Sequence, residues 1–271
     1  MSLGEKHQSI QRSLLEMQSV VVAYSGGIDS ALLLKIAHDT LGERAIGITA
    51  VSASLANAER IEARRVAQEI GARQIEIESH ETEDPRYLAN SPNRCFFCKS
   101  EVYDRLVAFA REHGYGYIVD GTNADDTGDH RPGRQAAREH GVRSPLLEAG
   151  LTKTDIRLLA RQLGLSIWDK PAAACLSSRM PYGTTITMQA LSQVEKAEQS
   201  LRKIGFRQLR VRHHDQLARI EVETQDFPKL MERREEIVRA LKEVGYVYVT
   251  LDLSGFRSGS MNEGLMAHGR R

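Results

Sequence analysis

The chain has 271 residues, and its composition, with 41% hydrophobic and 27% charged residues, is ordinary for a globular enzyme of one or two domains. No apolar run approaches the length of about 20 residues that crosses a bilayer, and residues 1–10 lack the apolar core of a signal peptide, so we expect a cytoplasmic protein without membrane contact. The net charge of +1, with acidic and basic residues interleaved, does not favour nucleic acid as a partner.

The first two thirds of the chain alternate between strand and helix patterns. A β-branched run at 20–24 ends in a glycine turn and is followed by apolar residues at helical spacing. Further strands are expected at 45–51, 74–77 and 117–119, with helices at 57–70 and 95–113. Residues 125–143 have the composition of a polar loop, and a capping box from Thr152 to Asp155 predicts a helix start. This alternation predicts an α/β fold whose parallel sheet carries helices on both faces.

A second, smaller domain is expected after a boundary at Thr184, which gives domains at 1–184 and 185–271. Its pattern is a helix at 188–204, a hairpin of strands at 208–212 and 217–222, a helix at 227–244 and a strand at 246–251. This order predicts a small α+β domain. The single tryptophan, Trp168, lies before the boundary and is expected in the core of the first domain.

The turn after the first strand, residues 25–30 (the glycine loop), predicts an anion site. Gly26 and Gly27 let the backbone come close to a ligand, and the exposed N–H groups of the following helix favour negative charge. The hydroxyls of Ser25 and Ser30 add two donors. Asp29 can order a metal ion or act only as a favourable charge at the helix N-terminus. No lysine follows the glycines, so the loop is not a Walker A motif.

A second loop is expected beside the glycine loop. Asp120 and Gly121 follow the strand at 117–119, and the carboxyl ends of parallel strands lie along one edge of a sheet. The sequence therefore predicts that these two residues share the nucleotide site.

Three cysteines require a chemical or a packing explanation. Cys95 and Cys98 are three residues apart at a helix start, which places both sulfurs on one face near the positive end of the helix. Cys175 lies far away in the chain. Packing, a nucleophilic cysteine and a 4Fe–4S cluster with one open iron all fit this count, while zinc lacks a fourth ligand at the usual spacing.

Arginines in the second half of the chain predict a phosphate site. Arg210 and Arg212 are two apart in a strand and share one face, where two guanidiniums repel each other unless an anion lies between them. Arg179, in the segment after Cys175, is a further candidate for a substrate phosphate; its alternative is a surface ion pair.

These motifs together resemble one family. S-G-G-x-D-S in the glycine loop resembles the pyrophosphate loop (PP loop) of ATP pyrophosphatases. With DGTNADD at 120–126, RPG at 131–133, CLSSRMPYGT at 175–184 and LDLSGFRSGSMN at 251–262, the chain resembles the LarE family of ATP-dependent sulfur transferases over nearly its full length. The resemblance implies that ATP and Mg²⁺ adenylate ring carboxylates of a pyridinium nucleotide, in which sulfur then replaces oxygen, to make a nickel-pincer cofactor. It also implies a homo-oligomer, a phosphate site at Arg210 and Arg212, and a metal near Glu221.

The family resemblance leaves two sulfur sources. In its sacrificial form the sulfur comes from the cysteine matching Cys175, which becomes dehydroalanine. This chain departs from that form because it carries Cys95 and Cys98. It is more similar to a three-cysteine branch, in which a 4Fe–4S cluster on all three thiolates is thought to carry sulfide from an external donor. We favour that branch.

Three other functions remain open from the sequence. A tRNA thiolase can combine a pyrophosphate loop with a C-x-x-C and a distant third cysteine. An ammonia-using amide synthetase would share the adenylation but need no cysteine. An ATP-binding regulator would not react at all.

Overall fold

The computed structural model describes residues 1–128, 132–171 and 173–257, which form two compact units. The first unit is Met1–Tyr87 with Asn93–Ala173, and the second begins with Leu88–Pro92 and continues from Ala174. Arg131 of the RPG motif and the end of the C-terminal motif, from residue 258, lie outside the described residues. The boundary expected after Thr184 concerns independently folding domains and stays a prediction.

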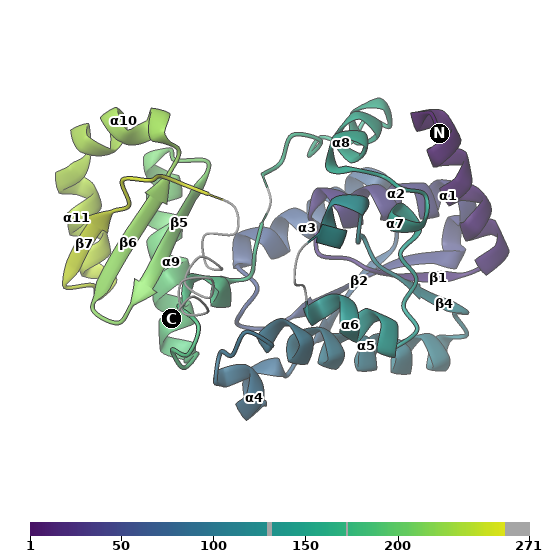
Figure 1. Cartoon of the computed structure of the whole chain (residues 1–271), viewed down its shortest axis with the longest axis horizontal. Coiled ribbons are helices and arrows are strands. Elements are labelled where there is room, and N and C mark those ends of the chain that lie inside the picture. Colours follow the sequence, from purple (N-terminus) through teal and green to yellow (C-terminus); the bar gives the residue numbers. More distant parts are fainter. Residues whose placement is uncertain (129–131, 172, 258–271) are drawn as a thin grey trace. The chain divides into compact units, whose positions relative to one another are not determined.

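The first unit contains a four-stranded sheet in the order β3-β2-β1-β4, of which β1, β2 and β4 are labelled in Figure 1. All three strand pairs are parallel, with Val20 opposite Ala45 on one side and Tyr117 on the other. The strands are β1 (Val20–Ala23), β2 (Ala45–Val51), β3 (Gln74–Glu78) and β4 (Tyr117–Val119). The predicted parallel α/β sheet is confirmed.

Helices cover both faces of this sheet, so each face has its own apolar core. On one side lie α1 (Leu3–Met17), α2 (Ile28–Leu41), α3 (Asn57–Ile70) and α8 (Lys153–Gln162); on the other lie α5 (Arg94–His113) and α6 (Pro132–Glu139) (Figure 1). Two one-turn helices, α4 (Pro85–Leu88) and α7 (Pro145–Glu148), join longer elements.

Two expectations for this unit are wrong. The segment expected as a polar loop at 125–143 contains α6, because Pro132 suits a first helical turn and Ala136 and Ala137 bury against α5. Trp168 is not in the core: it is 37% exposed, and the Arg161 guanidinium lies 5.0 Å from its ring centre.

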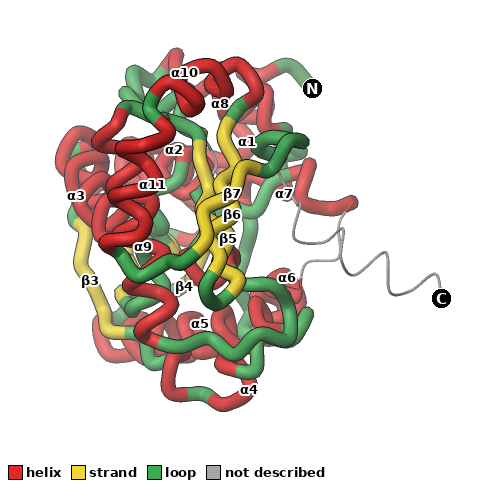
Figure 2. The backbone as a smooth tube through the Cα atoms, turned by 90° about the vertical axis from the view of Figure 1, so that its left-hand side faces the viewer, coloured by secondary structure: helices red, strands yellow, loops and turns green. Residues whose placement is uncertain are grey.

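The second unit has a three-stranded sheet in the order β5-β6-β7, visible as one layer in Figure 2. Strands β5 (Leu209–His214) and β6 (Leu217–Val222) are antiparallel, and β7 (Tyr248–Leu251) is parallel to β6. Residues of α9 (Met188–Ile204), α10 (Phe227–Glu232) and α11 (Arg234–Glu243) form the core against one face. The α+β pattern is as expected, but the helix predicted at 227–244 is two helices that meet at Arg233, with φ −96° and ψ 11°.

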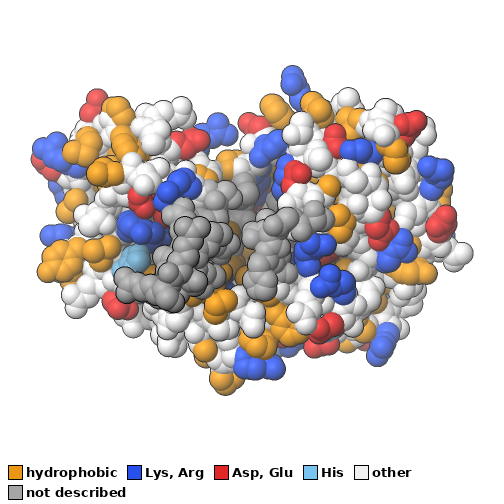
Figure 3. Space-filling view, viewed as in Figure 1, with side chains coloured by type: hydrophobic (Ala, Val, Ile, Leu, Met, Phe, Trp, Pro, Cys, Tyr) orange, Lys and Arg blue, Asp and Glu red, His pale blue; other side chains and the backbone are white. Residues whose placement is uncertain are grey.

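Figure 3 shows the distribution of charge on one face of the first unit. On the face shown in Figure 3, its acidic and basic side chains are interspersed rather than gathered by sign. Within the described ranges, no helix is both long enough and apolar enough to cross a membrane.

Candidate functional site

The glycine loop is held open by its own hydroxyl groups. Ser30 Oγ accepts from the Ser25 amide at 3.2 Å and donates to the Gly27 carbonyl at 3.1 Å. Its contact with Ser25 Oγ is 3.0 Å, and Gly27 is the N-cap residue of α2 without a side-chain cap. The first turn of α2 therefore has no capping side chain at Gly27, and a helix N-terminus of this kind suits a phosphate group.

Gly26 is required by both conformation and space. Its φ is +73°, and an added Cβ would lie 2.6 Å from Cβ and 2.9 Å from Cα of Ala63 in α3. Because Ala63 of α3 lies so close, α3 restricts the position of the glycine-loop backbone at Gly26.

The loop after β4 lies against the start of α2, as predicted. A Cβ added to Gly121 would be 2.8 Å from the Ser30 amide nitrogen, so only glycine allows this contact. Asp120 is buried and accepts from Tyr103 at 2.9 Å and from Ser144 at 2.7 Å, besides two bonds from Thr122. Asp120 thus anchors this loop, and its contact with nucleotide stays a prediction.

Asp29, in the first turn of α2, fits a metal ligand. Its Oδ1 is buried without a hydrogen-bond partner among the described residues, while Oδ2 accepts from Nζ of Lys153. Burial raises the pKa of Asp29, and the Lys153 ammonium opposes this rise. A buried carboxylate oxygen with no partner is a suitable Mg²⁺ ligand, because Mg²⁺ is bound in proteins by one or two carboxylates together with substrate phosphates.

Two lysines that the sequence analysis missed reach this loop. Lys153 begins α8, and Lys170 Nζ lies 3.2 Å from the Gly26 carbonyl oxygen and 2.8 Å from Glu59. The two cations at the loop therefore come from a segment far along the chain. In a Walker A motif, by contrast, the lysine directly follows the glycines. Both lysines come after the predicted parallel strands in the sequence. The sequence analysis did not select them, because polar side chains give no periodic pattern that would indicate a contact with the glycine loop.

The two cysteines of the C-x-x-C motif lie at the start of α5, as expected. Cys95 is exposed and Cys98 is half-buried, and none of the three cysteines forms a disulfide. Both belong to the first unit, while Cys175 belongs to the second. Among the described residues, no group of three or more His, Cys, Asp or Glu side chains is arranged to hold a metal ion.

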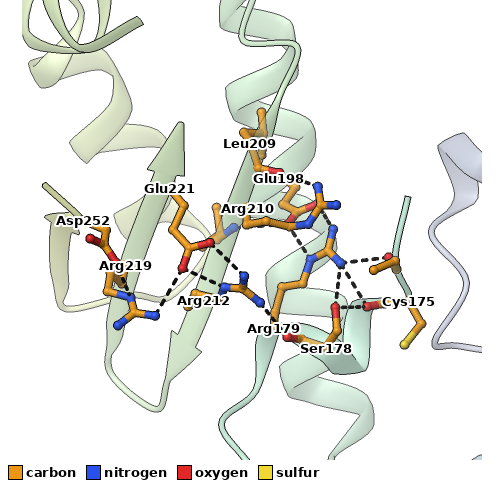
Figure 4. A network of polar contacts seen from close by, with 12 residues as sticks. Cys175, Ser178, Arg179, Glu198, Leu209, Arg210, Arg212, Arg219, Glu221 and Asp252 are labelled. Carbon is orange, nitrogen blue, oxygen red and sulfur yellow. Dashed lines mark hydrogen bonds and ion pairs between the residues drawn. The ribbon is translucent and has the colours of Figure 1, made fainter. Parts of the chain in front are cut away.

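Cys175 precedes a short 3₁₀ turn, Leu176–Arg179, in the second unit. The Arg179 side chain joins the backbone around Cys175 to helix α9 through hydrogen bonds (Figure 4). Nη1 of Arg179 donates to the carbonyl oxygens of Ala174 at 2.8 Å and Cys175 at 3.0 Å. Its Nε and Nη2 donate to Glu198 of α9 at 2.8 and 3.0 Å, and both side chains are buried. The Cys175 side chain is exposed and its sulfur points away from this pair. Arg179 thus positions the cysteine backbone, and its predicted phosphate contact remains untested.

Arg210 and Arg212 share the face of β5 opposite the apolar core, together with Glu221 of β6 (Figure 4). Arg212 makes a bidentate pair with Glu221 at 2.9 and 2.8 Å, and Arg219 donates to the same carboxylate at 3.2 Å. Burial, then repulsion from the guanidinium of Arg179, lowers the pKa of Arg210 to about 10. Arg210, Arg212 and Glu221 are buried and the arginines of this face outnumber its carboxylates, which suits a phosphate; the proposed metal near Glu221 would have to compete with two arginines.

Glu198 is a site residue that the sequence analysis missed, although a signal was present. It occupies the apolar stripe of α9, four residues after Val194 and seven after Leu191, and is fully buried. A carboxylate in such a stripe requires a buried cation, and here Arg179 supplies it.

Comparison with known proteins identifies relatives across the whole chain. A family model described as asparagine synthase matches residues 7–127. An uncharacterized protein of Synechocystis sp. is 45% identical over 262 residues, which cover 96% of this chain and 98% of the relative. The pyridinium-3,5-bisthiocarboxylic acid mononucleotide synthase of Lactiplantibacillus plantarum is 40% identical, covering 97% of this chain and 96% of its own. A tRNA-specific 2-thiouridylase of Rickettsia africae is 29% identical over 58% of this chain and 53% of its own length.

The matches to the synthase and to the thiouridylase differ in extent. The match to the synthase covers nearly the whole of both chains, whereas the match to the thiouridylase covers little more than half of each. The chain therefore belongs to the LarE-like PP-loop ATP pyrophosphatases, a family of ATP-dependent enzymes that insert sulfur.

Proposed function

We propose that this enzyme adenylates a carboxylate of a pyridinium mononucleotide and that sulfur then displaces AMP, so that sulfur replaces one carboxylate oxygen, as a step toward a nickel-pincer cofactor. The observation that carries the proposal is the 40% identity, over 97% of the chain, to a synthase named for the bisthiocarboxylic product. The start of α2 supports it, because its N-cap residue Gly27 makes no side-chain capping bond and the phosphates of ATP would bind at this helix N-terminus.

The first step uses the glycine loop. Ser25, Gly26, Gly27 and Ser30 would hold the phosphates through amides and hydroxyls, and Asp29 would hold Mg²⁺ through its unpartnered oxygen. The substrate carboxylate then attacks the α-phosphorus and pyrophosphate leaves. Positioning and charge neutralisation are sufficient for such a step, since phosphoryl transfer needs little covalent help from the protein.

The arginine face of the second unit would bind the phosphate of the mononucleotide. Arg210 and Arg212 lie side by side on β5, and bidentate guanidinium contacts suit a phosphate. Arg179 would hold Cys175 in place through the backbone bonds described above. Glu221, which fixes Arg212, is the residue that the family resemblance associates with a metal.

For the sulfur step we propose that Cys95, Cys98 and Cys175 together hold a 4Fe–4S cluster. The donor set fits, because three thiolates outside disulfides leave one iron open, and that iron would supply a binding position for sulfide. Sacrifice of Cys175 is the alternative route. We further propose a cytoplasmic homo-oligomer that takes sulfide from an external donor.

Iron and acid-labile sulfide should be measured first, on protein purified without oxygen. About four of each per chain are expected, and Cys95→Ala, Cys98→Ala and Cys175→Ala should each lose them. If the protein contains no iron and resists reconstitution, the cluster is refuted. Sacrifice then predicts that only Cys175→Ala is inactive and that one turnover leaves the wild-type chain lighter by one H₂S.

A tRNA thiolase remains the second candidate because of the partial match to a 2-thiouridylase. It predicts tRNA binding that weakens steeply with salt and ATP-dependent thiolation of tRNA. Our proposal predicts neither. An amide synthetase needs a separate assay with ammonia, in which a triple Cys→Ala variant would keep its full activity.

A further inference from the structure

Asp29 and Lys153 form an ion pair, and Lys153 has no role in the adenylation proposed above. Asp29 Oδ2 accepts from Lys153 Nζ, whereas Oδ1 is buried without a partner among the described residues. Only one of the two carboxylate oxygens of Asp29 therefore accepts a hydrogen bond from a described residue. The carboxylate lies at the loop where the proposed adenylation would place Mg²⁺. A metal ion bound to Oδ1 would lie close to the ammonium from which Oδ2 accepts its hydrogen bond, so two cations would repel each other at one carboxylate.

The backbone of Lys153 is fixed, so its side chain is the part that can move. Its amide donates to Asp125 at 2.7 Å, and the capping box of Thr152 and Asp155 fixes the first turn of α8. Asp155 in turn pairs with Lys6 of α1 at 2.6 Å. The Lys153 side chain is 42% exposed, so its flexible stem has space to swing away while the helix stays in place.

We propose that Lys153 is an exchangeable counter-ion: it pairs with Asp29 before nucleotide binds, yields that carboxylate to the Mg²⁺ that arrives with ATP, and then contacts the phosphates. Mg²⁺ needs oxygen ligands in a nearly octahedral arrangement, so it and the ammonium compete for one carboxylate. The displaced ammonium remains near the negative charge of the phosphates, where it is favourable again.

Competition of this kind predicts opposite effects on two affinities. Lys153 weakens the binding of a metal ion alone, because it must first leave Asp29. It strengthens the binding of metal and nucleotide together, because it gains the phosphates. A lysine that served only as a structural ion pair, or only as a phosphate ligand, would not produce this reversal.

The test compares Lys153→Met with Lys35→Met in the full chain. Lys35 is a matched control, since it pairs with Asp39 on the same helix at 2.7 Å, away from the loop. Mn²⁺ binding would be measured by electron paramagnetic resonance, first alone and then with a non-hydrolysable ATP analogue; no sulfur or carboxylate substrate is needed. We expect Lys153→Met to bind Mn²⁺ alone about tenfold more tightly and the Mn²⁺–nucleotide pair about tenfold more weakly, with Lys35→Met unchanged.

Several results would overturn the exchange. Lower affinity in both measurements, or unchanged Mn²⁺ binding with weaker nucleotide binding, would leave Lys153 as a structural or simple phosphate-binding residue. An equal gain in Lys153→Met and Lys35→Met would show a non-specific charge effect. In the Lys153→Met background, Asp29→Asn should abolish the gain, and Trp168 fluorescence during urea unfolding would confirm that each variant is folded. The inference rests on the proposed use of ATP at this loop, but these binding results do not depend on sulfur transfer.

Discussion

Replacing Gly26 with alanine should destabilise the first unit by about 2–5 kcal/mol. Its φ of +73° costs an L-residue about 1–2 kcal/mol. The new Cβ would also lie 2.6 Å from Cβ and 2.9 Å from Cα of Ala63, and such overpacking costs about 1–3 kcal/mol. The second contact is with backbone, so a change of side-chain rotamer cannot relieve it.

Gly114 provides the matched control. It ends α5 with φ +74°, and nothing lies within 4 Å of the Cβ that alanine would add. Gly114→Ala should therefore carry the conformational cost alone, about 1–2 kcal/mol. Urea unfolding followed by Trp168 fluorescence measures both variants, because the single tryptophan belongs to the first unit.

The difference between the two variants isolates the packing of α3 on the glycine loop. If Gly26→Ala loses no more stability than Gly114→Ala, then α3 does not restrict the loop as described. Ala63→Gly should recover part of the packing loss, although glycine within α3 costs about 1 kcal/mol itself. A loss that this second substitution leaves entirely unchanged would also contradict the reasoning.

Three further predictions concern charged groups. Hydrogen bonds from two arginines of α3 lower the pKa of Glu76 from 4.5 to about 2. The Glu76 carboxylate therefore contributes stability above pH 4.5 that is lost as the pH falls toward 2. In urea unfolding, Glu76→Gln should be less stable than wild type at pH 7 and equally stable near pH 2. Glu198→Gln leaves the buried Arg179 guanidinium without its carboxylate and should cost about 3–5 kcal/mol by circular dichroism during unfolding, unless Arg179 is not buried as described. Lys170→Met removes the cation beside Gly26 and should weaken ATP binding by about tenfold in calorimetry, and unchanged affinity would exclude a role at the loop.

Local patterns were sufficient to predict most of the first unit. Apolar periodicity gave the strands β1 to β4 and the helices α3 and α5, because burial on one face leaves a regular signal in the sequence. Parallel pairing then placed Gly121 beside the glycine loop. Patterns failed where contacts between distant segments decide the outcome: α6 depends on packing against α5, and Lys153 reaches Asp29 across more than a hundred residues. Neither contact changes the periodicity of its own segment.

The arginines of β5 show that the spacing of two like charges is limited evidence for a ligand. Spacing predicted an anion between Arg210 and Arg212, and the second unit contains buried anions of its own in Glu198 and Glu221. Spacing alone therefore does not establish a substrate phosphate. The charge around Arg210 is the stronger argument: after burial, its pKa is lowered mainly by other arginines, and Glu198 opposes them only in part. Three buried arginines, Arg179, Arg210 and Arg212, lie with two buried carboxylates, Glu198 and Glu221, and a phosphate dianion is a ligand that would balance the remaining positive charge.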